Sequence, residues 1–157
     1  MAWLEASALG RVMRESSLWT YPIVNLTHIL GVASLFGALV VLDLRLLGAW
    51  RDTPLASVSR PTVPVATAGG LVALLSGVCL LATNATEYAG NPFLFVKFPA
   101  IALGLVNVGV MTALPAWKAH GTRALDRREQ RQLAAGGAVS LACWLTAIAG
   151  GRMIGYW

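Results

Sequence analysis

The sequence predicts an all-α integral membrane protein, a single four-helix bundle over residues 1–157 with a short N-terminal interfacial helix. Three observations predict this class. Hydrophobic residues make up 57% of the chain and charged residues only 12%, whereas soluble domains are about half apolar and about a quarter charged. The apolar residues gather in long segments. These segments are four uncharged runs, Ser16–Leu42, Pro61–Thr86, Phe98–Trp117 and Gln132–Gly151.

Each uncharged run is long enough to cross a bilayer. A helix needs about 20 mostly apolar residues to span a hydrocarbon core of about 30 Å. We therefore expect transmembrane helices at about 21–44, 63–84, 97–117 and 133–153. Glycines within these segments predict close packing between helices, because small residues let membrane helices approach one another.

The first residues, MAWLEASALGRVMRE, predict a short helix in the membrane interface. Trp3, Leu4 and Val12 can share an apolar face that Glu5 and Arg14 avoid. A secretory signal would instead place basic residues before its apolar run.

The distribution of basic residues predicts the orientation. Four helices place both termini on one side, with Arg11, Arg14, Lys97 and Arg152. The other side holds eight basic residues, Arg45, Arg51, Arg60, Lys118, Arg123, Arg127, Arg128 and Arg131. Lys and Arg accumulate on the cytoplasmic side, so we expect a multi-pass protein of the bacterial inner membrane with both termini in the periplasm. The segment RALDRREQR has mixed charges and no aromatics, so we expect no nucleic-acid partner.

His28 is the principal candidate for a functional residue. If the membrane core begins near Pro22, six residues at 1.5 Å each place His28 about 9 Å deep. Asn25 lies one turn before it on the same face, and Gly31 lies at i+3. Ionisable residues inside membranes usually mark functional sites. The alternative is a structural histidine, bonded to a Ser, a Thr or a backbone carbonyl of a neighbouring helix.

Other polar groups are expected at the same end of the bundle. Lys97 opens the third predicted helix, and Arg152 and Tyr156 follow the fourth. An imidazole below two cations suits haem b, with His28 on the iron and Lys97 and Arg152 on the propionates. Gly31 would make room for the macrocycle. The alternatives are cations that only snorkel to the interface and an aromatic belt formed by Trp19, Tyr21, Tyr156 and Trp157.

The second axial ligand has no obvious source. The other histidine, His120, lies at the far end of the third helix and is expected on the cytoplasmic surface. The iron would be five-coordinate or would take Lys97 or Met153. Copper is the competing metal, because His28 with Met13 or Met153 offers an imidazole and a thioether.

Two further polar positions are expected to have structural roles. Asp43 and Arg45 should pair with each other or with the 118–131 loop, and Asn107 should bond another helix. Cys79 and Cys143 are single thiols without a CxxC motif, so packing is expected for both.

The chain resembles a bacterial family of four-helix inner-membrane proteins without an established activity. The shared features are SLWTYPIVNLTHILG, VLDLRLLG, NPFLFVK, the polar position Asn107 and GGRMIGY. It is distantly similar to CopD-type copper-resistance membrane domains and to HemJ-type protoporphyrinogen oxidases. In the HemJ family a helix-one histidine and a helix-three lysine accompany haem b, and His28 and Lys97 match them. Arg45 resembles another family position, whereas DLRLLG replaces the LPRLF pattern and GLVNVGV lacks the later histidine.

The resulting functional hypothesis is electron transfer through haem b, with a quinol, a porphyrin or a periplasmic protein as partner. The alternatives are a structural or assembly subunit of a membrane complex, and a copper-handling protein. The sequence leaves turnover and oligomeric state open.

Overall fold

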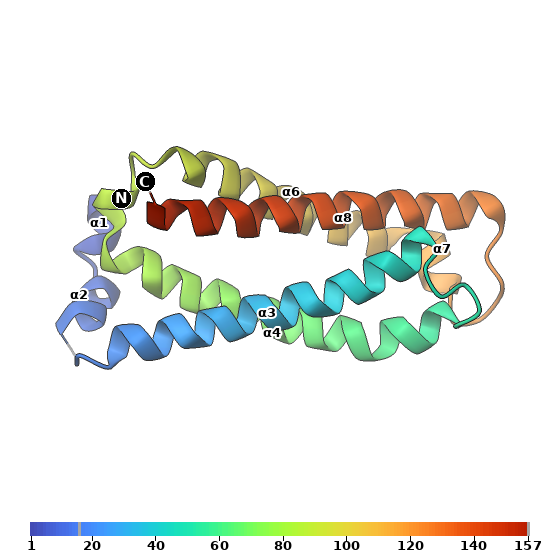
Figure 1. The fold of residues 1–157 in the computed structure, drawn as a ribbon, viewed down its shortest axis with the longest axis horizontal. Helices are drawn as coiled ribbons and strands as arrows, with labels where there is room; N and C mark the ends of the chain where they lie inside the picture. The colour runs from blue at the N-terminus through green and yellow to red at the C-terminus, as the bar shows by residue number, and fades with distance from the viewer. Residues whose placement is uncertain (16, 157) are drawn as a thin grey trace.

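The computed structural model describes residues 1–15 and 17–156. Trp157, which was considered from the sequence as part of an aromatic belt, lies outside the described residues. The described chain is helical (Figure 1). The long helices are α3 (Thr20–Leu47), α4 (Leu55–Thr83), α6 (Pro92–Ala113) and α8 (Arg127–Met153). The short elements are α1 (Ala2–Glu5), α2 (Ala8–Glu15), α5 (Ala85–Tyr88), α7 (Pro115–Ala119) and the 3₁₀ turn η1 (Ile154–Tyr156). The predicted all-α fold is confirmed.

The four long helices are each long and apolar enough to cross a membrane. Their outward faces carry large apolar side chains such as Leu30, Leu75 and Val106, all of them exposed. In water such surfaces would be costly, whereas lipid tails are as apolar as these side chains. The chain is therefore a multi-pass membrane protein whose helices face the bilayer.

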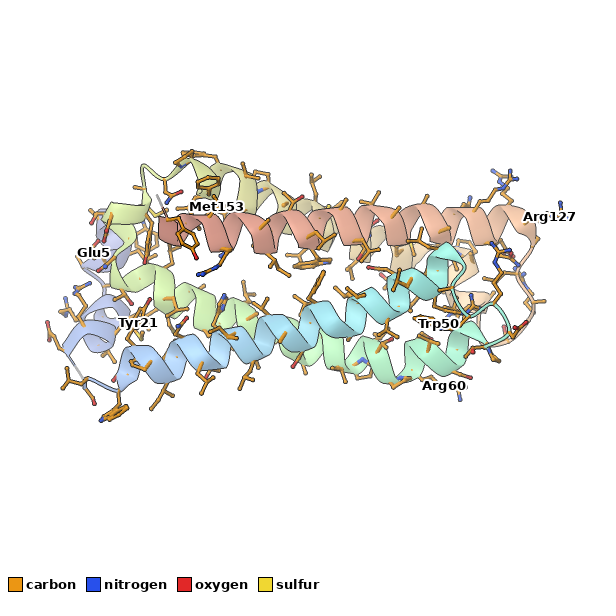
Figure 2. All side chains as sticks on the ribbon, in the orientation of Figure 1. Glu5, Tyr21, Trp50, Arg60, Arg127 and Met153 are labelled. Atoms are coloured by element: carbon orange, nitrogen blue, oxygen red, sulfur yellow. The ribbon has the colours of Figure 1, made fainter. Side chains whose placement is uncertain are left out.

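The helices pack as two pairs. α3 lies along α4, α6 lies along α8, and contacts between α3 and α8 join the pairs (Figure 1). Both termini lie at one end, here called the termini end, together with α1, α2 and α5; the opposite end, with α7, is the loop end. Figure 2 shows Tyr21 and Met153 at the termini end and Trp50, Arg60 and Arg127 at the loop end.

The boundaries of α6 differ from the predicted span. The helix begins at Pro92, because the Asn91 side chain accepts a hydrogen bond from the Phe93 N–H and proline suits the first helical position. It ends at Ala113, because Pro115 forces Leu114 into an extended conformation (ψ 136°). Lys97 therefore lies in the second turn of the helix rather than at its start.

The other long helices also begin before the predicted positions. α4 starts at Leu55, after the extended Pro54, and includes Pro61 and Pro64 in its second and third turns. α8 starts at Arg127 behind a capping box, in which Asp126 accepts the Glu129 N–H and the Glu129 carboxylate accepts the Asp126 N–H. These polar helix starts extend beyond the apolar spans, so hydropathy alone does not locate them.

Small residues form the contact between α3 and α4. A Cβ built on Gly69 would lie 2.5 Å from the Leu35 backbone nitrogen and 2.8 Å from the Gly31 carbonyl oxygen. Only glycine allows the two backbones to approach this closely. On the other pair, the Asn107 side-chain amide donates to the Gly136 carbonyl oxygen at 3.0 Å, which confirms the predicted interhelical bond.

The N-terminal segment forms two short helices instead of one. The helical conformation is interrupted at Ala6 and Ser7. The Ser7 hydroxyl then accepts a hydrogen bond from the Gly10 N–H in the first turn of α2. The Glu5 carboxylate accepts hydrogen bonds from the N–H and the hydroxyl of Thr86. This segment is thereby attached to α5, just beyond the end of α4.

We expect this attachment to weaken at low pH. The two hydrogen bonds from Thr86 are the main reason that the pKa of Glu5 lies below its ordinary value of 4.5. A pKa lowered by folding stabilises the folded state fully above 4.5, and this contribution is lost as the pH falls through the folded-state pKa. Hydrogen-exchange protection of the α1 and α2 amides should therefore fall in strong acid. Glu5→Gln should show weak protection at every pH; an unchanged acid-dependent fall in that variant would contradict the assignment.

Candidate functional site

α4 holds the His28 side chain in one orientation. The Nδ1 atom lies 2.9 Å from the Ala73 carbonyl oxygen and 3.1 Å from the Ser76 hydroxyl. A carbonyl oxygen can only accept, so Nδ1 must carry the proton. The Ser76 hydroxyl donates to the Val72 carbonyl, which leaves its oxygen free to accept as well. In the neutral ring, Nε2 therefore keeps its lone pair.

A glycine on α4 allows the ring to take this position. A Cβ built on Gly77 would lie 3.1 Å from Cε1 and 3.4 Å from Nδ1 of His28. The imidazole therefore rests directly on the surface of α4, and a larger residue there would press against it. The alternative suggested by the sequence, a histidine bonded to a neighbouring backbone carbonyl and a serine, describes the Nδ1 side of this ring correctly.

Lys97 extends toward the interior of the same end. A Cβ built on Gly150 would lie 3.4 Å from the Lys97 Cβ, and one built on Gly151 would lie 3.3 Å from Nζ. The double glycine of GGRMIGY thus leaves room for the lysine side chain along α8. Within residues 1–15 and 17–156, Lys97 has no hydrogen-bond or ion-pair partner.

Arg152 and Tyr156 lie at the exposed end of α8 and contact each other. The Arg152 guanidinium donates to the Tyr156 hydroxyl and lies 4.6 Å from the centroid of its ring. Both side chains are exposed. In the described part of the chain, no hydrogen bond joins either of them to His28 or Lys97.

Asn25 and Gly31 flank His28 on α3. The Asn25 side chain is half-buried one turn before His28. Gly31 is buried, and a Cβ built on it would lie 2.7 Å from the Ala73 backbone nitrogen. This glycine therefore faces the backbone of α4, and its contact with α4 accounts for its small size without a ligand.

The residues considered for copper lie in different environments. Met153 is 43% exposed at the end of α8, and Met13 is buried in α2, which packs against α4. Over the described ranges, no three His, Cys, Asp or Glu side chains come close enough to hold a metal together. Cys79 and Cys143 are free, half-buried thiols.

His120 is not the simple surface residue expected from the sequence. It is half-buried, and its Nδ1 donates to the Trp117 carbonyl. Its Nε2 therefore accepts the Ser59 hydroxyl, 2.8 Å away. This bond ties the segment after α7 to α4 at the loop end, so His120 serves packing and is far from the His28 site.

The pairing expected for Asp43 and Arg45 is wrong. Arg45 donates instead to the backbone carbonyls of Thr53 and Arg51. Asp43 is 3% exposed and lies inside the bundle. It is the buried polar residue that sequence reasoning placed incorrectly; its spacing of four from the buried Leu39 is the signal that it shares the interior face.

The fold defines a multi-pass membrane bundle whose termini end holds a fixed histidine and a lysine without a partner in the described part of the chain. Comparisons with known proteins found no matching family model, no matching curated protein and no matching solved structure.

Proposed function

We propose that this chain is a redox protein of the bacterial inner membrane that binds haem b at the termini end. The hydrogen bond from His28 Nδ1 to the Ala73 carbonyl is the observation that carries the proposal. Metal-ligating histidines commonly donate their other ring N–H to a carbonyl, which fixes the tautomer and the ring orientation. Nε2, which keeps its lone pair, would then be free to hold the iron.

Lys97 supports the same cofactor through charge. The Lys97 residue is half-buried at the same end of the bundle as His28, and it has no anionic partner among the described residues. A haem propionate would supply that anion in a charge-assisted hydrogen bond. Arg152, further out and exposed, is the candidate for the second propionate, with Tyr156 beside it. In this proposal His28 orients the cofactor, and Lys97 and Arg152 anchor its polar edge.

The donor set fits a haem with one histidine ligand. His120 is engaged at the loop end by Ser59, so His28 is the imidazole available at the termini end. The sixth position would be open or filled by Lys97 or Met153. Bound haem would supply one-electron exchange.

The electron-transfer partner is proposed from the orientation of the bundle in the membrane. The loop end carries most of the basic residues, which favours the cytoplasm for that end and the periplasm for the His28 end. A quinol in the bilayer, a porphyrin or a periplasmic protein could each approach the haem there.

An absorption spectrum of the purified protein tests the proposal. Protein made in cells supplied with a haem precursor and extracted in mild detergent should show a Soret band that shifts on reduction by a quinol. The His120→Ala variant should keep the band, because that histidine belongs to the loop end. A wild-type protein without a Soret band, purified intact, would overturn the haem proposal. Elemental analysis of the same sample would reveal copper if the metal-handling alternative holds.

A second candidate, a structural or assembly subunit, is favoured by one surface feature. A hollow of about 350 Å³ on the outer face of α3 and α4 is lined mainly by small residues, Ala33, Ser34, Gly37, Ala38, Pro61, Thr62 and Val65. Small residues at such a face allow another membrane helix to pack closely. This candidate would be favoured over haem if the wild-type protein purifies without haem in a complex with another membrane protein and the Gly37→Leu variant purifies without that partner.

A further inference from the structure

Asp43 is a carboxylic acid inside the membrane bundle, at the opposite end from His28. It is 3% exposed on α3 and faces α8. Gly137 makes this contact possible, because a Cβ there would lie 3.3 Å from the Asp43 carbonyl oxygen. The side chain of Ser140, itself buried on α8, lies close to the Asp43 carboxyl group.

One oxygen of the Asp43 carboxyl group has no partner among the described residues. The Oδ2 atom of Asp43 is buried and makes no hydrogen bond within the described structure. A second buried atom without a partner lies on the same face of α8: Nε1 of Trp144, one turn from Ser140. Trp144 packs against Leu39, which is one turn from Asp43 on α3. Within the described structure, the interior of the bundle therefore holds a buried acceptor on α3 and a buried donor on α8 that make no hydrogen bond.

No cation of the described chain neutralises Asp43. On α3, Arg45 turns to the backbone of the following loop. Among the elements packed against α3, α4 contributes Arg60 at this end, which is exposed. α8 contributes four charged residues at this end, of which Glu129 is paired with Arg123 and the arginines 127, 128 and 131 are exposed; its fifth, Arg152, lies at the termini end. α2 packs against α3 only at the other end of the bundle.

An unpaired carboxylate in this position would be costly. Transferring an isolated charge out of water is far more expensive than transferring a neutral acid, so such a group takes up a proton instead. One hydroxyl and one carboxyl group are also few ligands for a metal cation, which prefers several oxygens. Membrane-embedded carboxyl groups of this kind serve in proton relays.

We propose that Asp43 is a proton-binding site of the bundle, a buried carboxylic acid that exchanges one proton with the loop-end solution. The exchange converts a carboxylate and a proton into a carboxylic acid and forms no other bond. This site is independent of the haem proposal, because it lies at the other end of the molecule and involves none of the same residues.

Infrared spectroscopy of the protein in lipid vesicles tests this site. At neutral pH the wild-type protein should show the carbonyl stretch of a protonated carboxylic acid, and Asp43→Asn should lack it. Asp52→Asn is the matched control, because Asp52 is exposed in a loop at the same end; that variant should keep the band. Asp43 is the one buried acidic residue in the described chain, so no other group should contribute.

Three results would overturn the assignment. They are the absence of the band in wild type, its persistence in Asp43→Asn, and its loss when sodium chloride replaces choline chloride, which would indicate a metal cation. If Asp43→Asn does not fold, ¹³C-labelled aspartate in the Asp52→Asn/Asp126→Asn background isolates the same group. An isotope shift of the band would then support the proposal, and an unshifted band would refute it.

Discussion

Replacing His28 with glycine is expected to abolish the Soret band completely. The variant removes the proposed axial ligand and leaves a space that free imidazole can enter. Adding imidazole should therefore restore much of the band, because an exogenous ring can bind the iron in the same position. A milder variant, Ser76→Ala, removes one of the two groups that hold Nδ1. Loss of such a supporting bond costs roughly 10–100-fold in metal affinity, so haem should bind more weakly without being lost. Absorbance titration with haem measures both effects.

The matched control for His28→Gly is the same substitution at the other histidine, His120→Gly. His120→Gly should bind haem like wild type, although it should unfold more easily because the bond to Ser59 is lost. If His28→Gly keeps the band without imidazole, another residue holds the iron and the assignment is wrong. A folded His28→Gly protein that imidazole fails to restore would point to a role for His28 in packing alone.

Replacing Gly69 with leucine is expected to separate α3 from α4. The nearest atoms to a Cβ at this position belong to the backbone of Leu35 and Gly31, so no flexible side chain can move aside. Overpacking usually costs about 1–3 kcal/mol, and Gly69→Ala already introduces the clash. Gly69 lies one turn from Ala73, so the anchor of His28 should be displaced as well. We expect a lower thermal midpoint in detergent together with weaker haem binding.

Gly37→Ala is the corresponding control, because nothing lies within 4 Å of a Cβ at that position on α3. That variant should be as stable as wild type or slightly more stable, since alanine favours a helix over glycine. Equal stability losses in Gly69→Ala and Gly37→Ala would show that helix propensity, and not the contact between α3 and α4, determines the effect.

The membrane helices were predictable because apolar length is a strong and local signal. Their ends were harder, because the capping box at Asp126 and the cap at Asn91 act outside the apolar runs. Close packing through glycines could be expected from the sequence. The particular contact of Gly31 with Gly69 could not, because the sequence does not show which glycines face each other.

The candidate site was predictable only in part. That His28 and Lys97 share one end follows from the direction of their helices. The hydrogen bond between His28 and Ala73 could not be predicted. Every residue has a backbone carbonyl, and the sequence does not show which of them accepts from the imidazole. Asp43 was misplaced for a related reason. Its burial depends on how α3 is rotated against α8, which follows from packing across the bundle rather than from the residues next to it.

The central claim is that His28 presents a free Nε2 lone pair because Ala73 holds the proton on Nδ1. Nitrogen-15 NMR of histidine-labelled protein, prepared without haem and assigned with His28→Gly, measures this tautomer directly. We predict a neutral ring protonated on Nδ1. We also predict that the Nε2 resonance leaves its haem-free chemical shift when haem is added. A ring protonated on Nε2 in the haem-free protein would contradict the account.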